Sequence, residues 1–153
     1  MVPLIDLSRR MQANKEAFAL AVQQVMDSGN VLLGAQTTQF EKAFALFAGT
    51  QYGVAVSSGA AALQLSLAAL GIGEGDEVIV PAMTAVPTAS AVCAVGARPI
   101  IVDVDEETAA IDLDLVEAAM TERTRAVIAV HLYGRPVANL DRLMNLGVKV
   151  IED

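Results

Sequence analysis

Five short runs of β-branched and apolar residues recur along the chain at near-regular intervals, and they restrict the fold more than any other feature. The runs lie at 53–56, 77–80, 99–104, 126–130 and 148–151. Between them the sequence predicts helices at about 60–71, 85–95, 113–121 and 138–146. Continuous apolar strands that alternate with helices indicate a parallel sheet covered on both faces. We therefore expect an α/β fold of three layers, in which a mostly parallel sheet is flanked by helices.

The first 50 residues do not show this alternation. There the sequence predicts an extended arm over 1–10, a helix over 12–27 that ends at Gly29, and a helix over about 37–48. We see no linker between separate domains, so we assign 1–50 to an N-terminal arm with helices and 51–153 to the first part of a large α/β domain. The last residues lie in a strand-to-loop transition. We expect the domain to continue beyond Asp153, because a further helix is needed to cover that strand.

The composition excludes several classes of protein. Apolar residues make up 54% of the chain and charged residues 18%, which excludes a disordered tail. A net charge of −8 without a basic run argues against binding to nucleic acid or to an anionic membrane. The single cysteine, Cys93, excludes an internal disulfide and is expected to pack on an apolar helix face. Pro81 and Pro87 interrupt the uncharged segment 78–97, so we expect a soluble cytoplasmic protein without a spanning helix.

The segment 57–63, with the sequence Ser-Ser-Gly-Ala-Ala-Ala-Leu, is the first candidate site. It follows a predicted strand and opens a predicted helix. Small residues let a phosphate approach the backbone, and the free N–H groups at a helix N-terminus bind it. An ordinary strand-to-helix turn with small residues for packing has the same sequence, so both interpretations stay open. The segment matches neither of the common nucleotide-binding loop motifs.

Two further candidates lie where predicted strands end. Asp153 follows the last strand, where a carboxylate can face a ligand, although a helix cap or a surface acid is the other interpretation. His131, the only histidine, follows the fourth strand and is either a site residue or a structural histidine. A lone histidine cannot form a metal site, so no metal is expected. Asp112 is expected to cap the helix that follows it.

Seven segments, taken in order, are similar to those of one known family. They are Ser-Gly-Asn-Val-Leu-Leu-Gly at 28–34, Phe-Glu-Lys-Ala-Phe-Ala at 40–45, and the segments 57–65, 73–84, 96–105, 130–134 and 151–153. On these segments the chain resembles the N-terminal part of the DegT/StrS-type sugar aminotransferases. These are pyridoxal-phosphate enzymes with the aspartate-aminotransferase fold, called fold type I. The resemblance covers most of the chain and implies an incomplete large domain of such an enzyme.

The resemblance implies pyridoxal 5'-phosphate as the cofactor and assigns it contacts in this chain. The phosphate would lie at the turn of Gly59, on the backbone N–H groups of Ala60 and Ala61. Asp153 aligns with the family aspartate that pairs with the pyridine nitrogen. A carboxylate there keeps that nitrogen protonated, because a nearby opposite charge favours the charged form.

The residues beside the ring depart from the family pattern. Many members carry an aromatic residue that stacks on the pyridine ring where this chain has Ala85, and Met83 is the implied substitute. In the family, the lysine that forms the Schiff base follows the Ile-Glu-Asp motif, and therefore lies beyond Asp153. No catalytic residue is expected within this chain, because none of its three lysines matches that position; they are Lys15, Lys42 and Lys149.

The resemblance implies an aminotransferase that moves an amino group from an amino acid, with glutamate as the expected donor, to a nucleotide-linked keto sugar. It implies substrate contacts at Asn30, His131 and Tyr133, and a homodimer with its sites at the two-fold interface. Two alternatives stay open. One is a pyridoxal-phosphate deoxysugar dehydratase on the same scaffold, for which histidine would replace the lysine. The other is a non-catalytic α/β module that binds a phosphorylated ligand or a partner protein.

Overall fold

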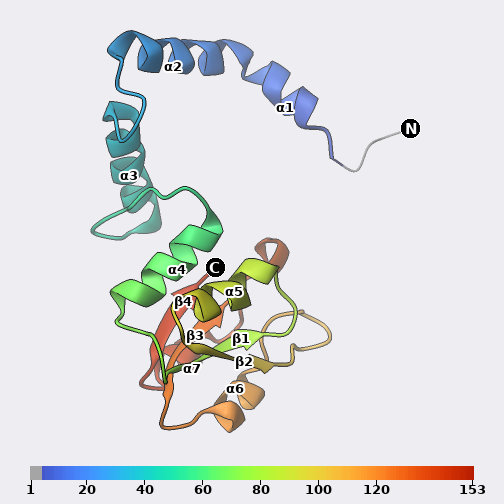
Figure 1. Cartoon of the computed structure of the whole chain (residues 1–153). Coiled ribbons are helices and arrows are strands. Elements are labelled where there is room, and N and C mark those ends of the chain that lie inside the picture. The colour runs from blue at the N-terminus through green and yellow to red at the C-terminus, as the bar shows by residue number, and fades with distance from the viewer. Residues whose placement is uncertain (1–4) are drawn as a thin grey trace. The chain divides into compact units, whose positions relative to one another are not determined.

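The computed structural model describes residues 5–153, and the chain divides after Ala55 into two compact units. The second unit is built on four strands, which are β1 (Glu77–Pro81), β2 (Arg98–Val102), β3 (Thr124–Ala129) and β4 (Lys149–Glu152). All neighbouring strands are parallel, in the order β2-β1-β3-β4 (Figure 1). The predicted parallel α/β sheet is thereby confirmed.

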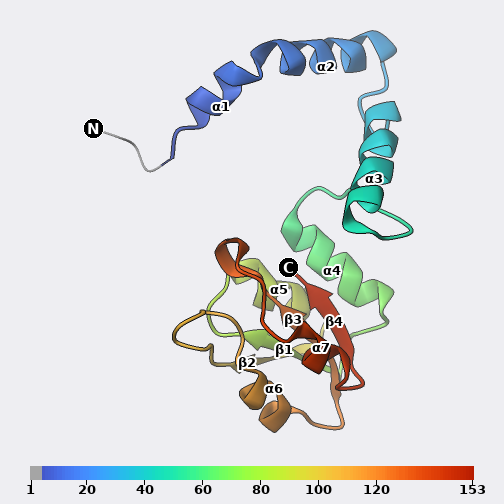
Figure 2. The same cartoon turned by 180° about the vertical axis from the view of Figure 1, so that it is seen from behind.

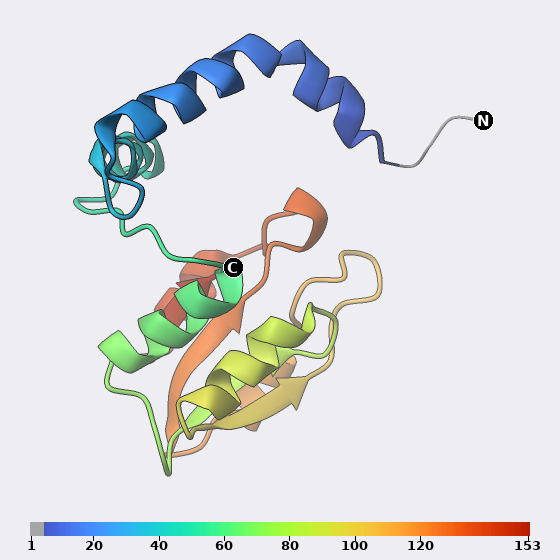
Figure 3. The same cartoon turned by 45° about the horizontal axis from the view of Figure 1, so that its top comes forward.

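Helices cover both faces of this sheet. On one face α4 (Gly59–Ala69) and α5 (Val86–Ala94) pack side by side, and on the other lie α6 (Leu113–Ala119) and α7 (Leu140–Met144) (Figures 2 and 3). Side chains alternate along a strand, so Val78 and Val80 of β1 join the core under α4 and α5, whereas Ile79 joins the core at α6 and α7. All three are fully buried, which explains why the strand sequences are continuously apolar.

Three details differ from the sequence prediction, the first at the boundary between the two units and the other two within the second unit. The run 53–56 pairs with no strand within the described residues: Val54 is 80% exposed, and the Ala55 N–H donates to the Glu41 Oε1 at 2.9 Å instead of to a neighbouring strand. Strand β2 ends at Val102, since Val104 instead forms an isolated antiparallel bridge with Ile111. Cys93 is exposed rather than packed on an apolar helix face.

From residue 5 onward the first unit contains three helices, which are α1 (Leu7–Ala13), α2 (Lys15–Ser28) and α3 (Ala35–Ala48). The two predicted helices correspond to α2 and α3, and α2 ends as predicted at Gly29, whose φ of 65° is left-handed. The predicted extended arm is wrong where it can be compared. The Asp6 side chain accepts a hydrogen bond of 3.1 Å from the Arg9 N–H and starts α1, while residues 1–4 lie outside the described part.

Candidate functional site

The carboxyl ends of the four parallel strands share one edge of the sheet, which we call the carboxyl edge. The strands end there at Pro81, Val102, Ala129 and Glu152. Helix α4 begins beside the same edge, and Figures 1, 2 and 3 all show the C-terminal residue, Asp153, next to its first turn. Ligands of open parallel sheets bind at this edge, because the helix N-termini and the loops after the strands converge on it. The structure thus brings together two of the candidates from the sequence, the segment 57–63 and Asp153.

The start of α4 has the features of an anion site. Ser58 is its N-cap, and the Ser58 Oγ accepts a hydrogen bond of 3.1 Å from the Ala61 N–H. The N–H groups of Gly59 and Ala60 have no acceptor among the described residues, as expected for the first turn of a helix. A Cβ placed on Gly59 would meet no heavy atom within 4 Å, so the space in front of the turn is open. Of the N–H groups predicted to hold a phosphate, that of Ala60 is free and that of Ala61 is shared with Ser58.

Asp153 is held at the edge by both backbone and side chain. Its N–H donates to the Ala129 carbonyl over 2.9 Å, and its carbonyl accepts from the His131 N–H over 2.8 Å, which continues the β3–β4 ladder. The Asp153 Oδ2 accepts a hydrogen bond of 3.2 Å from the Thr88 Oγ1. Thr88 is only 1% exposed, and its hydroxyl lies 2.8 Å from that of Thr84.

Thr84 and Thr88 are site residues that the sequence analysis missed. Thr84 lies in the loop between β1 and α5, and Thr88 lies in the first turn of α5. Their spacing of four positions, which lets side chains meet at the start of a helix, could be read from the sequence. What the sequence did not show is that Asp153, 65 residues later, meets them.

Met83 and Ala85 flank Thr84 in the same loop. Met83 is 45% exposed, and Ala85 is the extended N-cap residue of α5. Both therefore lie at the carboxyl edge with surface available to a ligand. Their contact with a cofactor ring stays a prediction.

His131 is hydrogen-bonded at both ring nitrogens. Nδ1 accepts from the Val137 N–H at 3.1 Å, so the neutral ring carries its proton on Nε2, which donates to the Glu152 Oε2 at 3.0 Å. These bonds tie the loop after β3 to the end of β4, which is a structural role. Tyr133, in the 3-10 turn Leu132–Gly134, is 90% exposed with φ at 56°, a left-handed conformation that costs a non-glycine residue about 1–3 kcal/mol.

Asn30 belongs to the first unit, in the loop between α2 and α3, where its N–H donates to the Ser28 Oγ at 3.1 Å. The proposed substrate contacts of Asn30, His131 and Tyr133 stay predictions. The second unit contains one lysine, Lys149, which is the first residue of β4 and lies away from the carboxyl edge, while Lys15 and Lys42 lie in α2 and α3 of the first unit. The described side chains also contain no group of three that could hold a metal ion.

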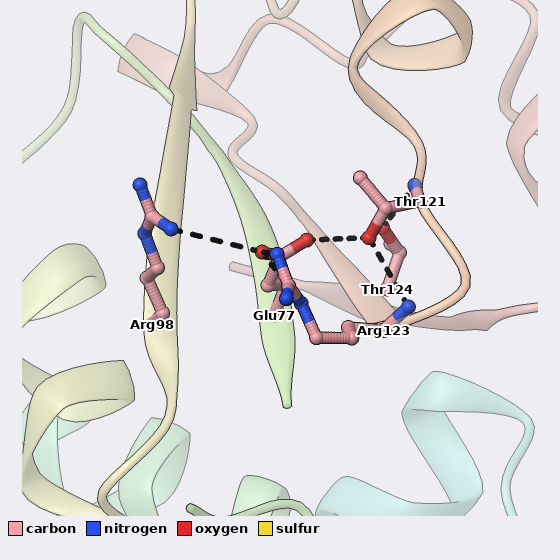
Figure 4. A network of polar contacts seen from close by, with 5 residues as sticks. All are labelled: Glu77, Arg98, Thr121, Arg123 and Thr124. Carbon is pink, nitrogen blue, oxygen red and sulfur yellow. Dashed lines mark hydrogen bonds and ion pairs between the residues drawn. The ribbon is translucent and has the colours of Figure 1, made fainter. Parts of the chain in front are cut away.

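A second polar cluster occupies the opposite, amino edge of the sheet (Figure 4). Glu77, at the start of β1, is 2% exposed, and its Oε2 accepts from the Thr121 Oγ1 at 2.6 Å. Its Oε1 accepts from Arg123 through Nη2 at 2.8 Å and Nε at 3.1 Å, with Arg98 4.0 Å away. The Thr121 hydrogen bond and then the Arg123 guanidinium lower the pKa of Glu77. Both carboxylate oxygens of Glu77 are thus occupied by Thr121 and Arg123, which indicates a structural role for this buried carboxylate.

Comparisons with known proteins agree with this geometry. A profile of the DegT/DnrJ/EryC1/StrS aminotransferase family matches residues 12–153. The dTDP-3-amino-3,4,6-trideoxy-alpha-D-glucose transaminase of Streptomyces venezuelae is 44% identical over 99% of this chain, which corresponds to 41% of the relative. The crystal structure of DesV from S. venezuelae superposes with a TM-score of 0.95 at 43% identity, over 99% of this chain and 42% of that one. Bacillus subtilis NtdA with bound cofactor PMP superposes with a TM-score of 0.92 at 35% identity, over 99% and 36% of the two chains. The chain therefore spans about two fifths of the length of these relatives.

None of the helices in the described part is long and apolar enough to cross a membrane.

Proposed function

The chain belongs to the DegT/DnrJ/EryC1/StrS aminotransferase family, and from this membership we propose that the whole protein is a pyridoxal-phosphate-dependent aminotransferase. It transfers an amino group from an amino acid, with glutamate as the expected donor, to a nucleotide-linked keto sugar. One observation carries the proposal: the start of α4 at Gly59 and the chain end at Asp153, whose carboxylate accepts from Thr88, share the carboxyl edge. The relative that is 44% identical supports the sugar substrate, since its name describes a transaminase of a dTDP-linked aminosugar.

The residues present fit the cofactor at its phosphate end. The free N–H groups of Gly59 and Ala60 and the positive end of the α4 dipole attract a phosphate, and the absence of a side chain at Gly59 leaves room for it. Ala61 adds a third N–H donor when its hydrogen bond to the Ser58 hydroxyl is broken. No lysine is needed for this contact, because backbone donors and the dipole suffice.

The residues also fit the ring end. The Asp153 carboxylate places a negative charge at the edge of the sheet, where it pairs with a protonated pyridine nitrogen. When bound, the cofactor supplies an electron sink for the bond that is broken at the substrate carbon. Met83, which is 45% exposed, would offer its polarisable thioether to the ring in place of the aromatic residue that the family often has at the position of Ala85.

The remaining parts of the proposal rest on the family alone. Asn30, His131 and Tyr133 contact the nucleotide sugar, and the bonds of His131 to Val137 and Glu152 also hold the loop of Tyr133. The group that moves the proton at the substrate carbon would be the Schiff-base lysine that the family carries after the position of Asp153, since Lys149, the lysine of the second unit, lies at the amino edge of the sheet. The enzyme is a cytoplasmic homodimer, in accordance with its single cysteine and its family.

The test uses the whole protein, purified with pyridoxal phosphate and incubated with glutamate and a dTDP-linked keto sugar. We expect 2-oxoglutarate to form in step with an aminated sugar, as followed by a coupled absorbance assay and mass spectrometry. Asp153→Asn removes the opposite charge and should lower the transfer rate strongly. Asp103→Asn, a matched change of an exposed carboxylate just after β2, should leave it nearly unchanged.

Two other outcomes would overturn the proposal. Loss of water from the sugar without consumption of glutamate would identify a dehydratase. Phosphate-competitive binding without either reaction would identify a non-catalytic module.

A further inference from the structure

We propose that Thr88 is a positioning residue for the cofactor: its hydroxyl, held in turn by Thr84, fixes the carboxylate of Asp153 in the orientation that meets the pyridine nitrogen. The inference rests on the proposed function, because it assigns the Thr88 hydroxyl a role in the same site. It concerns a side chain that never touches the cofactor and acts only through Asp153.

The burial of Thr88 is the first reason. Thr88 lies in the first turn of α5, where it is 1% exposed, and it is one of three buried polar or charged residues in the described chain. Burying a hydroxyl is unfavourable unless it is hydrogen-bonded. Its two partners are the Thr84 hydroxyl at 2.8 Å and the Asp153 Oδ2 at 3.2 Å. A valine would fill this space without any polar partner, so packing alone does not require the hydroxyl.

The chemistry of the three groups fixes the direction of the hydrogen bonds. An ionised carboxylate only accepts, so Thr88 donates its single proton to Asp153. The Thr88 oxygen then accepts from Thr84, which gives the order Thr84 to Thr88 to Asp153. Thr84 orients the Thr88 hydroxyl, and Thr88 in turn orients the Asp153 carboxylate. Hydrogen bonds linked in this way strengthen one another.

The second carboxylate oxygen of Asp153, Oδ1, is the one that a ligand could meet. The Asp153 Oδ1 has no hydrogen-bond donor among the described residues, whereas Oδ2 is tied to the buried hydroxyl. The backbone of Asp153 is fixed on both sides, by Ala129 and His131, so the remaining freedom of the residue is rotation of its side chain. One hydrogen bond to Oδ2 removes that freedom and leaves Oδ1 available to a ligand N–H. This is the usual way in which an outer partner orients a charged group in a site.

The experiment compares variants of the whole protein, with the dissociation constant of pyridoxal phosphate as the main readout. Thr88→Val keeps the shape and removes the hydroxyl, and we expect cofactor binding to weaken by about tenfold, the size of one hydrogen bond to a charged group. Thr88→Ser restores the hydroxyl and should recover affinity to within about threefold of the original. Thr84→Val removes only the group that holds Thr88 and should weaken binding by a smaller factor.

The matched control is Thr124→Val. Thr124 is also a buried threonine, 4% exposed, and its Oγ1 accepts from the Thr121 N–H at 2.9 Å, but it lies at the amino edge. This variant should lose thermal stability without the cofactor and keep the original affinity. A purely structural role for Thr88 would make Thr88→Val behave like Thr124→Val, and that result would overturn the inference. If the unaltered protein binds no pyridoxal phosphate, the proposed function fails as well, whereas tight binding by both the unaltered protein and Thr88→Val refutes the role of Thr88 alone.

Discussion

Replacement of Ser58 by alanine tests how α4 holds a phosphate. In the structure the Ser58 Oγ accepts from the Ala61 N–H at 3.1 Å and is the only side-chain cap of this helix. Loss of such a cap costs about 0.5–2 kcal/mol, typically about 1 kcal/mol. The free energy of unfolding of the cofactor-free Ser58→Ala protein should therefore fall by about 1 kcal/mol, as measured from the urea midpoint.

The cofactor should reduce this difference. Once Ser58 no longer occupies it, the Ala61 N–H is free to donate to the phosphate, together with those of Gly59 and Ala60. The bound anion then replaces the lost cap. The stability gap between the two proteins should shrink at saturating pyridoxal phosphate, and the dissociation constant should fall by up to about fivefold, which corresponds to the ~1 kcal/mol of the cap.

A second capping residue serves as the control. Asp112 caps α6 by accepting from the Asp114 N–H at 2.8 Å and the Leu115 N–H at 3.2 Å. Its replacement by alanine should cost a similar free energy, and this cost should be the same with and without the cofactor. If the gap for Ser58→Ala stays constant or widens when cofactor is added, Ala61 is not a phosphate donor and the reasoning is refuted.

Two further predictions concern stability. Leu67 of α4 is fully buried, so Leu67→Ala should lower the free energy of unfolding by about 2–5 kcal/mol. Leu65 is 55% exposed, so Leu65→Ala should change it by less than about 0.5 kcal/mol. Equal losses for the two variants in urea denaturation would contradict the described core. The pKa of Glu77 is lowered from 4.5 by Thr121 and then Arg123, so the stability it contributes is fully present above about pH 4.5 and is lost as the pH falls through the lower folded value. Glu77→Gln should therefore differ most from the unaltered protein at neutral pH and approach it in acid, and a gap that does not depend on pH would refute this.

The alternation of apolar runs and helices was sufficient to predict the sheet. Strand β1 is buried on both faces, so its sequence is continuously apolar and marks a central parallel strand. The same reasoning failed for 53–56, which is equally apolar, because a strand also needs a neighbour and the local sequence does not say whether one is present. The helix at Leu7–Ala13 was not predicted, although Asp6 occupies its N-cap and aspartate is among the residues preferred at that position.

At the candidate site, too, features that depend on neighbouring residues were predictable, and features that depend on residues far apart in the sequence were not. The small residues at 57–63 predicted an open helix start, and the structure places open space in front of Gly59. The threonines could not be found in this way, since Thr88 becomes a site residue only by meeting a side chain 65 positions away. Ser58 is intermediate, because its position before the helix predicts a cap, while its competition with a ligand for Ala61 is evident only from the geometry.

The two edges of the sheet also decide which group can serve the proposed reaction as a base. Lys149 and Asp153 belong to one continuous segment, and the four residue steps from one to the other carry the chain about 13 Å, from the amino edge to the carboxyl edge. A general base must come within about 3 Å of the proton that it takes. Its strand position therefore excludes Lys149 from that role even though it is the only lysine in the second unit. In the proposed aminotransferase, residues of the second unit hold the cofactor's phosphate and ring nitrogen, and Lys149 is not the residue that moves the proton at the substrate carbon.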